Sequence, residues 1–272
     1  MSRFRPRKCH RLPWSSTIHL AGSGEVLDFF HDFTPEQIQT ARRAYYGSVS
    51  YVDALVGRVL AALRDSGQAD DTIVMFLSDH GDMLGERGLW YKKVFFEAAM
   101  RVPLMIAGPG IDATRRVQTP VSLVDLAPTL VALAGGDPVA DTADPFDGVD
   151  LFDAAGHRDD RPVFAEIMSE GIAHPVVMIR RGKHKFIGGP MHPVQLFDLA
   201  EDPDELRNLA LEPESAALVA EFGALMEQQW DFASLEEDIL VSQKRRAIIQ
   251  RAHRQGHNPG WDHEAASLER DR

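Results

Sequence analysis

The chain has little cysteine, no excess of positive charge and no long apolar run. Cys9 is the only cysteine among 272 residues, so no disulfide can form within the chain, which fits a reducing compartment. The net charge of -12 argues against a nucleic-acid-binding protein. No stretch approaches the apolar length of a transmembrane helix, and the basic start of the chain lacks the apolar run of a secretory signal. The sequence therefore predicts a soluble, cytoplasmic protein.

Length and composition place the chain among ordinary folded proteins. At 272 residues it can form one large domain or one and a half smaller ones. Its hydrophobic content of 44% and charged content of 26% are typical of globular proteins. The acidic balance still allows an anionic substrate, because nearby lysines and a bound cation can reverse the field inside a cleft.

The first clear element is a long helix over residues 34–66. Thr34, Pro35 and Gln37 give an N-cap, a proline at the first helical position and a capping box. Apolar residues then recur close to the helical period, and Gly67 can supply a left-handed stop.

Strands and further helices are predicted after this helix. Residues 72–77 are apolar on both faces, as buried parallel strands tend to be. A second strand over 102–107 precedes a helix over 122–134. Beyond a loop rich in Gly, Pro and Asp, four short segments predict an antiparallel meander, at 163–167, 176–181, 185–187 and 195–198.

Two helices close the predicted order, over 214–230 and 235–255, the second capped by Ser234 and ended at Gly256. Together these patterns predict an α/β fold with a smaller carboxyl-terminal sub-domain of antiparallel strands and helix. The expected division is an irregular segment 1–33, an α/β part 34–150, a β sub-domain 151–233 and a tail 234–272.

The most informative segment follows the first predicted strand, where Asp79 and His80 stand side by side. A carboxylate and an imidazole are metal ligands, and ligands of α/β proteins bind in loops after the carboxyl ends of strands. The alternative is an ordinary tight turn, in which Asp and Gly are common. Lys92 lies further along the same segment and is a candidate clamp for an anion, although most lysines are simply solvated.

This segment, TIVMFLSDHGDMLGERGLWYK, resembles the metal-dependent sulfatases of the alkaline-phosphatase-like superfamily, and among them the bacterial choline sulfatases. The resemblance runs from about Thr34 to Asp262 and includes ARRAYYG, RVPL, LFDL and the tail HNPGWD. It implies a mixed sheet flanked by helices, from which the amino-terminal strands are missing here. The tail carries the most group-specific part of the match.

The resemblance also implies roles for the site residues. Asp79 and His80 would complete a cation site whose other ligands lie in an amino-terminal half, and His80 would also be a catalytic residue. Calcium is the leading cation, with manganese and magnesium as alternatives. Lys92, by its spacing from Asp79, would be the catalytic, substrate-binding lysine that stabilises charge on the sulfuryl oxygens, whereas Lys93 is expected to be structural or exposed.

Further residues of the same region are given structural or substrate-binding roles. Glu86 and Arg87 are interpreted as ion-pair partners that stiffen the loop, and Trp90 as a core residue. Glu170 aligns roughly with an acidic residue that lines the choline pocket in the resembled group. A carboxylate is expected in such a pocket, because recognition of a quaternary ammonium needs aromatic faces and a nearby negative charge. An exposed loop glutamate is the alternative.

The carboxyl-terminal tail carries arginines on a predicted helix. A nucleic-acid or membrane patch is one interpretation, but the acidic chain and the helical spacing favour a subunit contact. In the resembled enzymes this tail packs on a neighbouring subunit, so the resemblance implies a homo-oligomer.

One departure from the family is large. Its members carry a nucleophile in C-x-P-x-R or S-x-P-x-R, where Cys or Ser is converted to formylglycine, and neither motif occurs in these 272 residues. The expected function is hydrolysis of choline-O-sulfate, a sulfuric ester. The alternatives are a phosphonate monoester or phosphodiester hydrolase of the same superfamily, or a non-catalytic fragment that needs a separate amino-terminal half.

Overall fold

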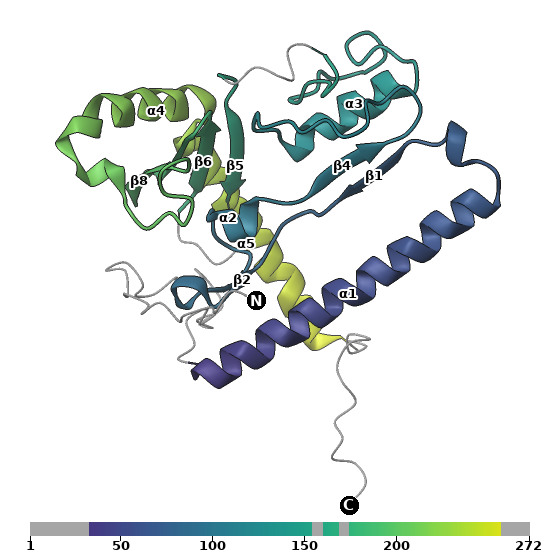
Figure 1. The fold of residues 1–272 in the computed structure, drawn as a ribbon. Coiled ribbons are helices and arrows are strands. Elements are labelled where there is room, and N and C mark those ends of the chain that lie inside the picture. The colour runs from purple at the N-terminus through teal and green to yellow at the C-terminus, as the bar shows by residue number, and fades with distance from the viewer. Residues whose placement is uncertain (1–32, 154–159, 169–173, 257–272) are drawn as a thin grey trace, which may run out of the picture.

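A computed structural model describes residues 33–153, 160–168 and 174–256 and has helices alongside three small sheets (Figure 1). Helix α1 (Pro35–Asp65) begins with the predicted capping box. Thr34 Oγ1 accepts from Gln37 N, and Gln37 Oε1 accepts from Thr34 N. Gly67, at φ 72°, ends the helix in the left-handed conformation. The long helix predicted from the capping pattern is confirmed.

The first strand pairs differently from the expectation. β1 (Val74–Leu77) and β4 (Leu104–Ala107) form an antiparallel pair with Phe76 opposite Met105. The prediction of a buried strand typical of parallel sheets is therefore wrong, since β1 is half-buried and Leu77 is exposed. Among the described residues no third strand joins this pair. Apolar residues on both faces of a strand do not specify the direction of its neighbour.

Short elements connect β1 to β4. A 3-10 turn (Ala69–Asp71) precedes β1. After β1, the chain forms the small hairpin of β2 (Met83–Leu84) and β3 (Trp90–Tyr91), with a helical turn η2 (Glu86–Gly88) at its tip. Helix α2 (Glu97–Met100) then turns the chain into β4.

The antiparallel meander is confirmed. Its strands are paired in the order β5-β6-β7-β8, with bounds Val163–Ile167, Val176–Arg181, His184–Gly189 and His192–Asp198. Before it, the turn Leu123–Asp125 and α3 (Leu126–Leu133) form the predicted helix. Buried Asp125 receives two hydrogen bonds from Arg161 and thereby ties α3 to the chain that enters β5.

The last helices are α4 (Ala216–Gln229) and α5 (Phe232–Gln255). Turns Leu209–Leu211 and Pro213–Ser215 lead into α4. The cap of α5 is Asp231, whose side chain accepts from Ser234 N, so the prediction of Ser234 as cap is wrong. The predicted end of this helix at Gly256 is confirmed, and Gly256 itself is extended, at φ -93°.

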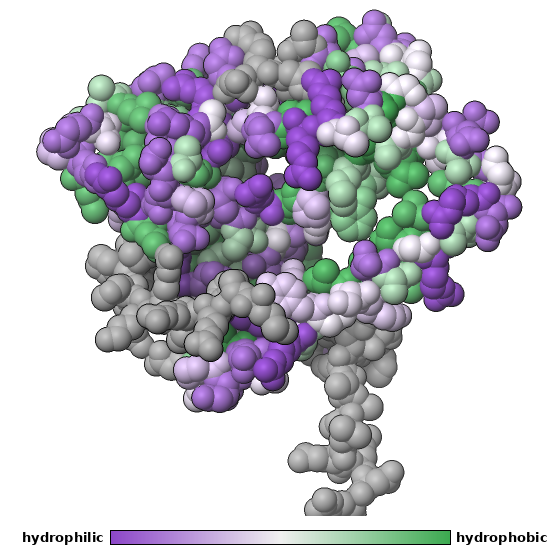
Figure 2. Space-filling view, in the orientation of Figure 1, coloured by the Kyte–Doolittle hydropathy of each residue, from purple (hydrophilic) through white to green (hydrophobic). Residues whose placement is uncertain are grey.

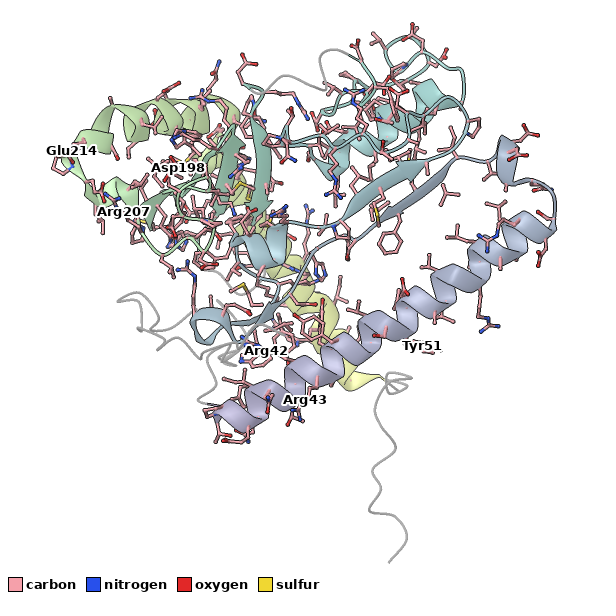
Figure 3. The ribbon with its side chains drawn as sticks, viewed as in Figure 1. Arg42, Arg43, Tyr51, Asp198, Arg207 and Glu214 are labelled. Atoms are coloured by element: carbon pink, nitrogen blue, oxygen red, sulfur yellow. The ribbon has the colours of Figure 1, made fainter. Side chains whose placement is uncertain are left out.

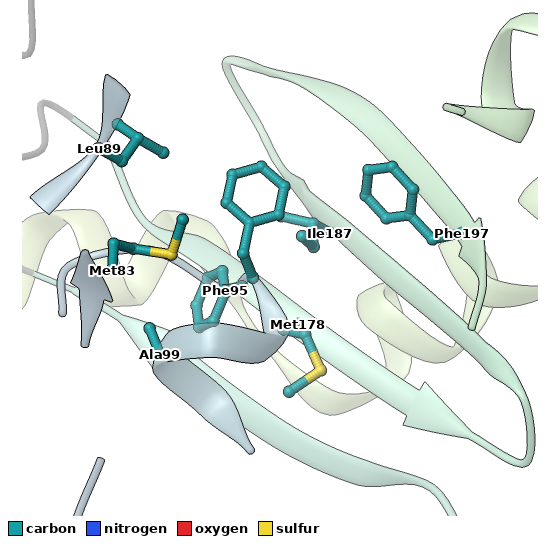
Figure 4. Close-up of a cluster of buried hydrophobic side chains, with 8 residues drawn as sticks. Met83, Leu89, Phe95, Ala99, Met178, Ile187 and Phe197 are labelled. Atoms are coloured by element: carbon teal, nitrogen blue, oxygen red, sulfur yellow. The ribbon is translucent and has the colours of Figure 1, made fainter. Parts of the chain in front are cut away.

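Two apolar clusters cover the two faces of the β5–β8 sheet. One joins the meander to the segment between β2 and α2 (Figure 4), through Met83, Leu89, Phe95, Phe96, Ala99, Met178, Ile187 and Phe197. The other joins it to α4, with Phe186 stacked on Phe222 at 5.7 Å between ring centroids. Because adjacent residues of a strand point to opposite faces, β7 contributes to both clusters.

Around α1 and β1, by contrast, apolar side chains are exposed. No residue of α1 is buried, and hydrophobic residues colour parts of the surface over β1 and β4 (Figure 2). We call this the open apolar surface, defined by Val49, Val52, Leu55, Val59, Leu77 and Met105. Among the described residues, no helix has the length and apolar character needed to cross a membrane.

Candidate active-site loop

The loop after β1 is held in place by close contacts with α2. Gly81 N donates to Ala99 O at 2.8 Å. A Cβ at Gly81 would lie 2.1 Å from Ala98 O, so only glycine allows this approach. Asp82 accepts a hydrogen bond from the Tyr45 hydroxyl of α1; burial first, and then the Asp82 charge, raise the pKa of Tyr45. The sequence Asp-His-Gly-Asp thus fixes a loop between α1 and α2.

Hydrogen bonds orient Asp79 and His80 toward each other. His80 N donates to Asp79 Oδ1 at 2.9 Å, and His80 Nδ1 lies 2.9 Å from Gly81 O. Since a carbonyl only accepts, Nδ1 carries the proton and the lone pair of a neutral ring lies on Nε2. Nε2 faces Asp79 Oδ2 at 3.4 Å. Two electron-pair donors at this separation favour a shared proton or a bound cation.

The charge and exposure of this pair suit a cation from solution. The Asp79 side chain is 82% exposed and that of His80 33%. The hydrogen bond from His80 N is the largest cause that lowers the pKa of Asp79; desolvation opposes it, and the charges of His80 and Lys92 add smaller lowering effects. The carboxylate is therefore ionised at neutral pH, and Lys92 is close enough to contribute to its field.

The donor set fits a divalent cation only as part of a coordination shell. Carboxylate oxygen and imidazole nitrogen suit calcium, manganese or magnesium in different degrees. Within the described ranges, however, no group of three or more His, Cys, Asp or Glu side chains could hold a metal ion. The structure thus brings together the two predicted ligands, and any further ligands must come from elsewhere.

Lys92 lies immediately after β3, in a turn where Val94 N donates to Lys92 O at 2.7 Å. A cavity of about 270 Å³ adjoins it, lined by Lys93, by apolar residues of the following segment and by the end of β5. Glu170, three residues beyond the end of β5, lies outside the described residues. The cavity therefore connects the lysine loop with the strand that leads to Glu170.

The contacts of Glu86 and Arg87 correct one prediction. They do not pair with each other. Glu86 pairs with Arg42 of α1 at 3.1 Å and accepts from Leu84 N at 2.6 Å, and the position of Arg42 can be followed in Figure 3. Arg87 instead donates to the carbonyls of Asp204 and Glu205. Both residues stiffen the loop, but they do so through partners far along the chain.

Other residues near the loop have structural contacts. Trp90 is half-buried and packs edge-on against Phe33, with ring centroids 5.3 Å apart. His174 Nδ1 lies 2.7 Å from Glu236 Oε1 of α5. Sequence reasoning missed one polar group in this region, the buried Lys185 with Glu97 and Glu205. Its only signal was a lysine within an otherwise apolar strand.

The fold and the loop define an α/β protein of the alkaline-phosphatase-like class. Residues 11–136 match the sulfatase family model, and residues 85–231 match that of the carboxyl-terminal part of N-sulphoglucosamine sulphohydrolase. The chain belongs to the sulfatase family.

The similar proteins are much longer than the part of them that this chain matches. The chain is 42% identical to the choline-sulfatase of Rhizobium meliloti, over 86% of this chain and 46% of that protein. It is 35% identical to arylsulfatase K of Danio rerio, over 76% of this chain and 39% of that protein. The chain thus spans about half the length of these relatives or less.

The chain also covers less than half of the solved structures that it resembles. The phosphonate monoester hydrolase of Agrobacterium radiobacter superposes with a TM-score of 0.63 at 30% identity, covering 76% of this chain and 43% of that one. A 2-O GAG sulfatase superposes with a TM-score of 0.58 at 30% identity, covering 70% and 42%.

Proposed function

We propose that this chain forms the carboxyl-terminal part of a metal-dependent sulfuric-ester hydrolase that converts choline-O-sulfate to choline and sulfate. The observation that carries the proposal is the facing pair of Asp79 Oδ2 and His80 Nε2, 3.4 Å apart, with Lys92 in electrostatic reach. The similarity to the Rhizobium meliloti choline-sulfatase supports the choice of ester.

The residues of this chain would act by binding and by charge stabilisation. Asp79 and His80 would hold the cation, most favourably calcium and alternatively manganese or magnesium, which when bound would polarise sulfuryl oxygens. The Lys92 ammonium would stabilise negative charge that builds on the leaving oxygen of choline and on the sulfuryl oxygens, and this preference for the transition state would accelerate the reaction. Glu170 would attract the quaternary ammonium of choline.

The nucleophile is not part of these residues. The sequence contains neither C-x-P-x-R nor S-x-P-x-R, so these residues offer no site for formylglycine. An amino-terminal half would have to supply it. The basic helix α5 and the tail beyond it would make the subunit contact of a homo-oligomer, in the cytoplasm.

The experiment is a chimera in which this chain replaces the matched segment of the Rhizobium meliloti choline-sulfatase. We expect the chimera to release sulfate from choline-O-sulfate and to lose this activity with a chelator. A matched Glu170→Gln chimera should raise KM for choline-O-sulfate more than for a neutral aryl sulfate. A folded chimera that hydrolyses only phosphonate monoesters or phosphodiesters would instead support the alternative suggested by the Agrobacterium radiobacter structure.

A second candidate function is that of a non-catalytic partner for a separate amino-terminal half, and the open apolar surface favours it. Surfaces of this kind mark interaction sites or cause aggregation. We expect the isolated chain to self-associate, and Met105→Glu to reduce the association measured by light scattering. Met105 is 58% exposed on β4, whereas Val139, 85% exposed and outside this surface, supplies the control Val139→Glu. A monodisperse chain with a sharp thermal transition would contradict this expectation.

A further inference from the structure

A buried ionic cluster lies beneath the loop that carries Lys92. Lys185 of β7 is 1% exposed. Its ammonium contacts Glu97 Oε1 at 2.5 Å, Glu205 Oε1 at 2.8 Å and Phe95 O at 2.8 Å. An ammonium has three donors, and here each has one acceptor. Glu205, which is 3% exposed, also accepts from Glu97 N at 2.7 Å.

The turn that contains Glu205 also contacts the part of the loop that precedes Lys92. Arg87 donates to the backbone carbonyls of Asp204 and Glu205, and its guanidinium lies 4.0 Å from the centre of the Phe96 ring. The turn at Asp204-Glu205 therefore contacts the chain both before Lys92, at Arg87, and after it, at Glu97. We call Arg87, Glu97, Lys185 and Glu205 the loop clamp.

The loop needs external support, because its backbone is strained. Arg87 and Tyr91 have positive φ angles of 57° and 66°, and Glu205 has 55°. Such conformations are costly for residues other than glycine and persist where the surroundings impose them. Arg87 and Tyr91 lie at the two ends of the short segment that leads into Lys92.

Stability alone does not account for the clamp. Buried ion pairs cost desolvation energy, and apolar residues of similar volume often replace them without loss of stability. Their known use is to fix one arrangement among several. In this chain the arrangement that they fix is the path of residues 87–97 over the β5–β8 sheet, with Phe95 and Phe96 buried against it.

We propose that Lys185, Glu205 and Arg87 are positioning residues that hold Lys92 at the site formed by Asp79 and His80. The meander sub-domain thereby sets the affinity for a sulfuryl group that it does not itself contact. This inference rests on the proposed role of Lys92, but the clamp can be tested separately from that role.

The test uses the full chain and inorganic sulfate as the probe. The variants are Lys185→Met/Glu205→Gln, which removes the buried charges with little change of volume, and Arg87→Met, which removes the second attachment. We expect amides of residues 88–97 to exchange hydrogen at least about tenfold faster in both, while those of β6 and β8 are unchanged. Sulfate affinity should fall by a similar factor. Arg207→Met, which breaks the exposed Arg207–Glu212 pair at 2.6 Å, is the control and should change neither quantity.

Lys92→Ala separates the two hypotheses. It should weaken sulfate binding and leave exchange in residues 88–97 unchanged. If Lys92→Ala leaves sulfate binding intact, or the unmodified chain does not bind sulfate, the proposed role of Lys92 fails, and faster exchange in the clamp variants would still support the clamp. Exchange in 88–97 no faster than in Arg207→Met, or uniformly faster along the whole chain, would overturn the clamp as a positioning device.

Discussion

Alanine in place of Lys92 is expected to lower kcat of the chimera on choline-O-sulfate by about 10²- to 10³-fold, the usual effect of removing one group that stabilises transition-state charge. KM should change much less, because the charge on the leaving oxygen develops only as the transition state is reached. The measurement is steady-state sulfate release at saturating cation.

Lys93 provides a matched control for this prediction, because it is the neighbouring residue and has the same charge. Both lysines border the cavity beside β5, but only Lys92 is among the charges that lower the pKa of Asp79. Lys93→Ala should therefore leave kcat nearly unchanged. Lys92→Arg should recover part of the rate, since a guanidinium keeps the positive charge but spreads it over a plane instead of concentrating it on one ammonium group. Equal losses for Lys92→Ala and Lys93→Ala would contradict a specific role for Lys92.

How far the fold follows from sequence depends on whether its determinants are local. The capping box at Thr34 and Gln37 and the left-handed Gly67 involve neighbours in the chain, and both predictions are confirmed. The four strands of the meander are connected in order, so their antiparallel pairing also follows from the pattern. The cap of α5 shows a limit, because Asp231 and Ser234 are both good caps and the pattern does not choose between them.

Distant contacts explain what sequence could not predict. β1 pairs antiparallel with β4 across the whole loop region. The apolar sequence of a strand does not specify which strand it pairs with. Glu86 and Arg87 are adjacent and oppositely charged, but their partners are Arg42 and the carbonyls of a turn more than a hundred residues away. The loop clamp depends on Lys185, ninety residues from Phe95. For Asp79, His80 and Lys92, sequence gave the positions, and their roles stay predictions.

Asparagine in place of Asp79 is expected to lower affinity for a divalent cation by at least about 100-fold, because loss of a group that merely supports a ligand already costs 10- to 100-fold. Asparagine keeps the shape and one carbonyl oxygen but removes the negative charge. Calcium, which takes oxygen ligands, should lose most of its binding energy, whereas a cation that prefers nitrogen would be affected less through His80. Titration calorimetry with calcium, manganese and magnesium on the chimera measures each affinity.

Ser78→Ala is the control for this substitution, because Ser78 supports the loop without being a proposed ligand. Its hydroxyl donates to His80 O at 2.9 Å and lies 3.4 Å from Asp79 Oδ1, so its loss should weaken cation binding only through a looser loop. Activity of Asp79→Asn should fall together with cation occupancy and recover partly at high cation concentration. If the variant binds all three cations as tightly as the parent, Asp79 is not a ligand, and its contact with His80 only closes the turn after β1.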